Sequence, residues 1–214
     1  MDFKRREFLR LTANLAAGLA IVPMACNSSS NDDKSKENGS ADSTTASNTT
    51  ADAGVAITSF GPQLFSLRDD LSKAPKGVLN QVHSFGYKQI EGYEGKDGMF
   101  WGMSNTDFKK YMDELGMTFV SSHCDINKDF EKKASEAAAI GMKYLICPYK
   151  GPQKKLDDYK KFADEFNQKG EICKKNGIRF AYHNHDYTFK ELEGQMPQDV
   201  LMNGTDPGLV DYEM

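Results

Sequence analysis

The chain has 214 residues, a formal net charge of −4 and a pI near 5.6. This charge gives no electrostatic reason to expect nucleic-acid binding, and no lysine-rich face stands out. Apart from Cys26, the cysteines are Cys124, Cys147 and Cys173, whose spacing fits neither a disulfide framework nor a zinc ribbon. We expect these three to be small buried apolar residues.

The first segment, residues 1–26 (MDFKRREFLRLTANLAAGLAIVPMAC), is predicted to be an export signal. Arg5 and Arg6, followed by EFLR, resemble the twin-arginine export signature. The alternative is a basic amphipathic helix of a cytosolic protein. The residues before Cys26 resemble a lipoprotein cleavage box, so we expect lipidation of Cys26, although Pro23 departs from that pattern and leaves cleavage without a lipid open. The expected location is the periplasm or a membrane surface, reached only through the lipid anchor.

The second segment, residues 27–54, is dominated by Ser, Thr, Asn and Asp and contains no aromatic residue. Such a segment cannot bury enough apolar surface to offset the entropy of ordering it. We predict a disordered tether here, and a folded domain over residues 55–214.

The folded part has a repeating pattern. Four glycines, each at the end of a helix-like stretch, are followed directly by apolar runs: YKQIEGY after Gly86, MTFVSSHC after Gly116, MKYLICPY after Gly141 and IRFAYHNH after Gly177. Glycine fits the left-handed position that closes a helix. The runs are typical of parallel strands that are buried on both faces.

The stretches between these runs have helical periodicity, as in Leu156, Tyr159, Ala163 and Phe166. Alternating strands and helices predict βα units around a parallel sheet. With residues 57–67 as a first strand and residues 209–214 as a last one, we expect six strands. No GxGxxG motif follows the first run, which disfavours a dinucleotide fold. The expected fold is an α/β (βα)8 TIM barrel, of which this chain holds about six of eight strands.

Polar residues occur where the predicted strands end. Glu91, His123, His183 and His185 all lie at carboxyl ends of strands, and barrel enzymes place their chemistry on that face. In the segment FAYHNHDYTF, alternation along a strand puts His183 and His185 on one side. Two neutral imidazoles there can share a metal ion, or one can bind metal while the other transfers a proton. The alternative is a plain polar turn.

Several stretches together resemble the sugar phosphate isomerase/epimerase family with a xylose isomerase-like barrel. They are FGPQLFSLRDDL, FGYKQIEGY, MTFVSSH and GIRFAYHNHDYTF. The resemblance implies a divalent metal at the barrel mouth, most often Mn²⁺, with Zn²⁺, Co²⁺ or Mg²⁺ as alternatives. It places His183 at a metal-ligand position, where many relatives have a carboxylate, with His185 beside it as a ligand or catalytic group.

The resemblance also implies roles for other residues. Glu91, His123 and His185 are candidate catalytic residues for proton transfer. Gln63 and Phe65 are expected to form the floor of a substrate pocket. Trp101 covers a sugar face or simply anchors its loop, and Glu213 is a candidate substrate contact that points inward.

The family motif that begins at LVDYEM continues beyond Met214, so we expect the chain to be a fragment of a longer protein and inactive alone. The activity implied for the intact protein is isomerisation or epimerisation of a sugar, keto-sugar or polyol by metal-assisted proton transfer next to a carbonyl. A keto-glycoside lyase or dehydratase is an alternative, as is a non-catalytic, surface-anchored sugar-binding lipoprotein. A nuclease with this barrel is disfavoured by the negative charge. The sequence does not indicate an oligomeric state.

Overall fold

The computed structural model describes residues 59–214. The predicted export signal, the lipidation of Cys26 and the predicted tether lie outside the described residues. Among the helices of residues 59–214, none combines the length and the apolar character that crossing a membrane requires.

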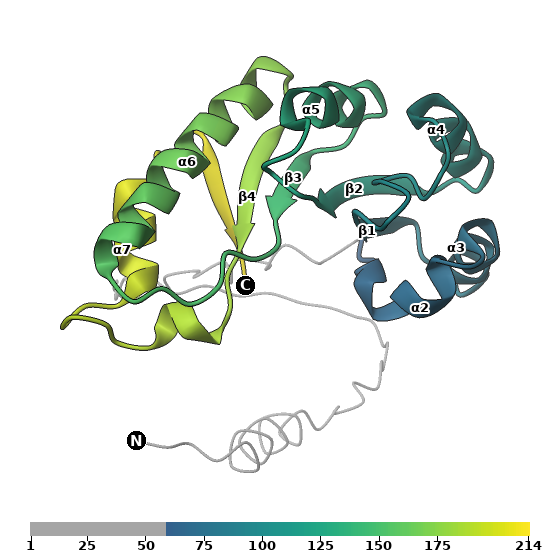
Figure 1. Ribbon diagram of the computed structural model, residues 1–214. Coiled ribbons are helices and arrows are strands. Elements are labelled where there is room, and N and C mark those ends of the chain that lie inside the picture. Colours follow the sequence, from purple (N-terminus) through teal and green to yellow (C-terminus); the bar gives the residue numbers. More distant parts are fainter. Residues whose placement is uncertain (1–58) are drawn as a thin grey trace, which may run out of the picture. The chain divides into compact units, whose positions relative to one another are not determined.

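The core of the domain is a parallel sheet with its strands in sequential order (Figure 1). The strands are β1 (Gln89–Tyr93), β2 (Thr118–His123), β3 (Tyr144–Cys147), β4 (Arg179–His183) and β5 (Val210–Glu213). Each pairs in parallel with the next one along the chain. This winding, with helices between successive strands, is the pattern of a βα barrel and confirms the predicted α/β architecture.

Over residues 59–67 the predicted first strand does not form, so the sheet of the described residues has five strands instead of the six expected. Gln63 alone forms a parallel bridge, to Glu91, and the 3₁₀ helix η1 (Leu64–Leu67) follows at once. Pro62 has no N–H for a ladder, although its carbonyl accepts from the Glu91 N–H at 3.1 Å. The Gln63 side chain then accepts a hydrogen bond from the Phe65 N–H at 2.8 Å, which turns the chain into the helix.

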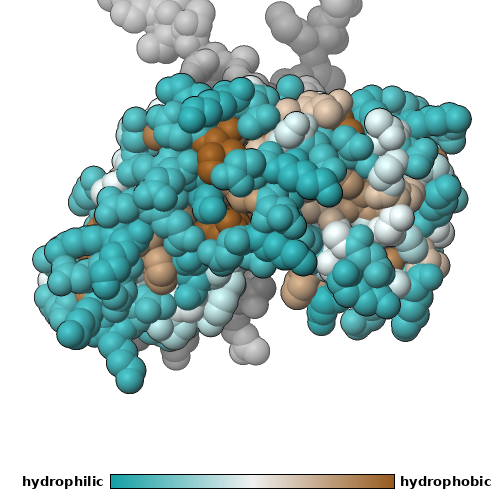
Figure 2. Space-filling view, turned by 45° about the horizontal axis from the view of Figure 1, so that its top comes forward, coloured by the Kyte–Doolittle hydropathy of each residue, from teal (hydrophilic) through white to brown (hydrophobic). Residues whose placement is uncertain are grey.

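The helices lie on the outer side of the curved sheet (Figure 1). Tyr182 of β4 points outward and stacks on Phe166 of the longest helix, with ring centroids 4.8 Å apart. On the face shown in Figure 2, hydrophobic colour is confined to limited areas between hydrophilic side chains. The helices are α2 (Arg68–Leu71), α3 (Pro75–Ser84), α4 (Asn105–Glu114), α5 (Phe130–Ala139), α6 (Leu156–Lys175) and α7 (Pro197–Gly204), with the short η2 (Asp186–Phe189). The predicted periodicity is confirmed for α6, in which Leu156, Tyr159, Ala163 and Phe166 are all buried.

The four glycines that precede the strands have the predicted conformation. Their φ angles lie between +60° and +91°, in the left-handed region where a side chain would be strained. Each one ends a helix and turns the chain into the next strand, so the spacing of these glycines sets the βα repeat.

The cysteines of the domain are free and buried, as expected. Burial raises the pKa of the Cys147 thiol to about 11, so it remains protonated at neutral pH. Cys124, Cys147 and Cys173 are therefore packing residues.

Candidate active site at the strand ends

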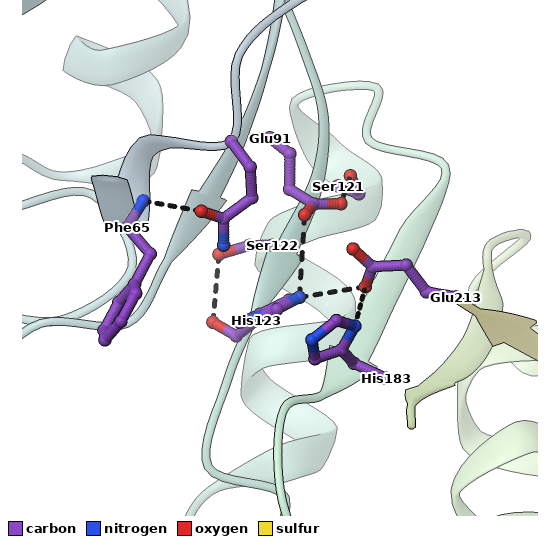
Figure 3. Close-up of polar contacts among 8 residues, drawn as sticks. Phe65, Glu91, Ser121, Ser122, His123, His183 and Glu213 are labelled. Atoms are coloured by element: carbon purple, nitrogen blue, oxygen red, sulfur yellow. Dashed lines mark hydrogen bonds and ion pairs between the residues drawn. The ribbon is translucent and has the colours of Figure 1, made fainter. Parts of the chain in front are cut away.

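Four polar side chains meet at the carboxyl end of the sheet. Glu91 comes from β1, His123 ends β2, His183 ends β4 and Glu213 is the last residue of β5. The strand register pairs His183 directly with Glu213, because β4 and β5 are parallel neighbours. Strands that are distant in sequence thus deliver two imidazoles and two carboxylates to one place (Figure 3).

His123 is the centre of this group. Its Nε2 lies 2.9 Å from Glu213 Oε2 and 3.5 Å from Glu91 Oε1. The His183 Nδ1 lies 3.7 Å from the same Glu213 oxygen (Figure 3). The His123 side chain is only 11% exposed, so these contacts form in a region with little solvent screening.

A β-bulge shapes the position of Glu91. The pairing of β1 with β2 shifts between Ile90 and Glu91, which leaves Val120 as an extra residue in β2. Bulges of this kind re-aim the side chains that follow. Ser121 is thereby placed opposite Glu91, and its hydroxyl donates a hydrogen bond of 2.5 Å to Glu91 Oε2.

The two carboxylates have different protonation behaviour. Burial raises the pKa of Glu91 to about 7; the hydrogen bond from Ser121 and the charge of His123 oppose this rise, and the charge of Glu213 adds to it. Burial also favours a higher pKa for Glu213, but the hydrogen bond and charge of His123 outweigh it and hold that pKa below its usual value. Near neutral pH, Glu91 exchanges a proton readily while Glu213 stays ionised. Pairs of carboxyl groups separated in this way are typical of acid–base sites.

This separation predicts a pH-dependent stability for the metal-free protein. Folding raises the pKa of Glu91 from 4.5 to about 7. The stabilisation that protonated Glu91 adds to the free energy of unfolding is therefore fully present below pH 4.5 and is lost as the pH rises through about 7. This stabilisation is on the order of 3 kcal/mol. Relative to Glu91→Gln, which does not titrate, wild type should lose stability across this window. Urea unfolding at pH 4.5, 6 and 8 in the presence of a chelator measures the difference, and a constant difference would contradict the assignment.

Three of the four side chains fit a divalent metal. The donor atoms of His123, His183 and Glu213 all lie within 4.8 Å of one another. The Nδ1 of His183 is buried and has no hydrogen-bond partner among residues 59–214, and burial lowers the pKa of this imidazole, which keeps it neutral. Two imidazoles and one carboxylate are a ligand set that Zn²⁺ and similar ions accept in catalytic sites.

His185 lies outside that group of three. The strand ends at His183, so alternation no longer controls the next residues. The His185 ring stacks on Tyr187 with an interplanar angle of 9° and meets the edge of Tyr149 at 5.0 Å between centroids. Its own centroid is 4.9 Å from that of His183. Of the two histidines predicted as ligands, His183 therefore belongs to the group of three close donor atoms, and His185 lies next to it.

A cavity of about 1050 Å³ opens above the site. Its lining includes the predicted floor residues Gln63 and Phe65, and also His123, His183, His185 and Glu213. This volume is typical of a small-molecule site. Trp101 is not among the lining residues: it is 7% exposed and packs against Phe108 and Phe119 at 5.7 and 5.9 Å between centroids. Of the two roles considered for Trp101, this placement fits a residue that anchors its own loop and not one that covers a sugar face.

Some residues of the site were not predicted. Ser121 precedes His123 by two positions on the same strand, so the period of two was a usable signal for it. Tyr93, Glu94 and Tyr149 also line the cavity, but Glu94 and Tyr149 belong to loops. Loop side chains have no periodicity that would reveal their direction.

The fold and the position of the site define a xylose isomerase-like TIM barrel. A scan against protein-family models and a search of curated proteins find no match. Among solved structures, a sugar phosphate isomerase/epimerase from Parabacteroides distasonis is similar, with a TM-score of 0.62, 26% identity, and coverage of 75% of this chain and 66% of that one. A second such structure from the same organism has a TM-score of 0.64 and 28% identity over 73% of this chain and 68% of that one.

A more distant structure has the same fold. The xylose isomerase domain protein from Alicyclobacillus acidocaldarius has a TM-score of 0.54 and 10% identity, over 72% of this chain and 62% of its own length. The chain therefore spans about two thirds of the length of the structures it matches.

Proposed function

We propose that the protein is a sugar or keto-sugar isomerase or epimerase that transfers a proton next to a carbonyl group. The observation that carries this proposal is the arrangement of Glu91 and Glu213, two carboxylates of different proton affinity that both lie against Nε2 of His123. The similarity to sugar phosphate isomerase/epimerase structures at 26% and 28% identity supports it.

Under this proposal a divalent metal, with Mn²⁺ as the first candidate, is held by His123, His183 and Glu213. When bound, it supplies polarisation of substrate oxygens, which lowers the cost of removing a proton from the adjacent carbon. The closeness of the three donor atoms supports this assignment, as does the buried Nδ1 of His183, which has no hydrogen-bond partner within residues 59–214.

The residues of the chain then provide the proton transfer. In its ionised form, Glu91 accepts the proton from the carbon next to the carbonyl; in its protonated form, it returns one. A pKa of about 7 allows both states near neutral pH. Ser121 fixes Oε2 of Glu91, and Oε1 lies 3.5 Å from Nε2 of His123, next to the proposed metal ligands. Delivery of a proton to the opposite face of the same carbon by a second acid, for which His185 of the cavity lining is the candidate, gives epimerisation. Return of the proton by Glu91 to the neighbouring carbon gives isomerisation.

The experiment that tests the proposal is solvent exchange. The full-length protein, loaded with Mn²⁺, is incubated in D₂O with unphosphorylated ketoses and the sugars are analysed by mass spectrometry. We expect incorporation of one carbon-bound deuterium, and loss of this incorporation after treatment with a chelator. If no ketose of the panel gains deuterium under saturating conditions, the proposed proton transfer is wrong.

A further inference from the structure

A second polar group lies beside the candidate active site, in the lining of the same cavity. Glu94 follows the last residue of β1 and lines the same cavity as His123. Its backbone N–H donates to the carbonyl of His123 at 2.8 Å. The backbone of Glu94 is therefore fixed next to His123, although Glu94 is not one of the four polar groups described above.

The carboxylate of Glu94 is held firmly on one side. Its Oε2 lies 2.7 Å from the Nζ of Lys133 and accepts the backbone N–H of Asp125, also at 2.7 Å. Lys133 comes from α5, is 8% exposed, and also donates to the carbonyl of Asp125 at 2.8 Å. The other oxygen, Oε1, accepts no hydrogen bond from residues 59–214, although the side chain remains 20% exposed.

Stability alone does not explain such a pair. Removing an ammonium and a carboxylate from water costs several kcal/mol per ion in typical proteins, and an apolar pair of similar volume is often as stable. What the pair does provide is orientation, because one oxygen is fixed by two donors and the second has no donor among residues 59–214, while Glu94 lines the cavity. A carboxylate held in this way is a strong acceptor for a hydroxyl group.

The walls around Glu94 suit a hydroxylated ring. Phe65 and Tyr149 line the same cavity, and their side chains are 51% and 56% exposed. Aromatic rings pack against the apolar C–H face of a ligand, while the hydroxyl edge needs polar acceptors. Exposed rings and a fixed carboxylate in one cavity provide both.

The charges of the cavity disfavour an anionic group. Glu94, Asp125 and Glu213 all line it. Of the lysines in the lining, Lys150 is already 2.6 Å from Glu165, and Lys96 lies 3.9 Å from Asp97. The third, Lys128, is exposed, where water and salt screen its charge. A phosphate near Glu94 would meet a like charge without a dedicated cationic partner.

We propose that Glu94, positioned by Lys133 and the Asp125 amide, is a second hydroxyl-binding subsite that receives the uncharged, hydroxyl-bearing end of the substrate and selects against phosphorylated sugars. The inference rests on the proposed function to the extent that it takes the cavity as a sugar site. It adds to that function a residue and a substrate class that the metal and proton-transfer groups do not determine.

The test is equilibrium binding by isothermal titration to the full-length protein with Mn²⁺ present. The probes are D-fructose, sucrose and D-fructose 6-phosphate. We expect wild type to bind at least one of the neutral probes more tightly than the phosphate. Glu94→Gln should weaken binding of that neutral probe about tenfold, the loss typical of a hydrogen bond to a charged group. The matched control Glu114→Gln, at an exposed position near the end of α4, should bind like wild type.

Lys133→Met should weaken binding to a similar degree, and Lys132→Met, on the exposed neighbouring position, should not. Because Lys133→Met leaves the carboxylate of Glu94 unpaired and is expected to be less stable, the double variant Glu94→Gln/Lys133→Met is measured as well. We expect it to bind no more weakly than Glu94→Gln alone, since Lys133 acts on the ligand only by positioning the carboxylate that Glu94→Gln already removes. Tighter binding of the phosphate, wild-type affinity in Glu94→Gln, or binding of no probe overturns the inference.

The deuterium exchange experiment separates this inference from the proposed function. Binding that depends on Glu94 without exchange would retain the subsite and remove the isomerase activity. Deuterium exchange together with binding that is independent of Glu94 would retain the isomerase activity and remove the subsite.

Discussion

Replacing Glu91 with glutamine should lower kcat for deuterium exchange and ketose turnover by about 10²–10⁴-fold, the usual contribution of a general acid–base group. Glutamine has nearly the same shape and still accepts a hydrogen bond, so the contact with the Ser121 hydroxyl can remain. What is lost is a group that gains and releases a proton near pH 7. KM should change little, because the substitution removes proton transfer and leaves the cavity unchanged.

The measurement is a pH profile of kcat for wild type, Glu91→Gln and the control Glu114→Gln. In wild type, we expect a limb governed by a group of pKa about 7, and in Glu91→Gln that limb should be absent. A variant that retains the limb and most of its kcat would assign the proton transfer to His123 or Glu213.

Replacing His183 with alanine should lower the affinity for Mn²⁺ by at least tenfold. His183 supplies one of three donor atoms that lie within 4.8 Å of one another, and loss of an outer partner alone commonly costs about 10–100-fold. The same change at His185 should have a smaller effect, because its ring is packed between Tyr149 and Tyr187 outside that group.

Metal content after equilibrium dialysis, measured by mass spectrometry of the two variants and wild type, makes the comparison. Thermal unfolding of the same samples shows whether each variant is folded. Loss of metal from His185→Ala with full occupancy in His183→Ala would move the ligand role to His185 and return His183 to packing or substrate contact.

Much of the fold follows from local pattern. A glycine that needs a positive φ, followed by an apolar run, marks the start of β1, β2, β3 and β4, and amphipathic periodicity marks α4, α5 and α6. These signals are local because a helix end and a buried strand each impose a condition on a few neighbouring residues. The segment around Gln63 was harder to predict, since Pro62 and the side chain of Gln63 turn an apolar run into a 3₁₀ helix.

The residues of the candidate site also divide into those that a local pattern indicates and those whose contacts depend on the folded domain. Glu91, His123 and His183 could be selected from the sequence because each lies at the end of a strand, and parallel strands bring those ends to one edge. Alternation and the family resemblance predict that His185 lies beside His183, and the two rings are 4.9 Å apart and line the same cavity. Because β4 ends at His183, the stacking of His185 on Tyr187 has no signal in the strand pattern.

By itself, the sequence determined the βα repeat, the parallel sheet and the rim on which the polar residues lie, because these depend on periodicity and on turn chemistry. Only the tertiary structure decided which polar groups interact. The contact of His123 with Glu213 joins residues 90 positions apart, and the ion pair of Lys133 with Glu94 joins a helix to a loop. Such contacts depend on strand register, on the bulge in β2 and on burial, and all three arise from the packing of the whole domain.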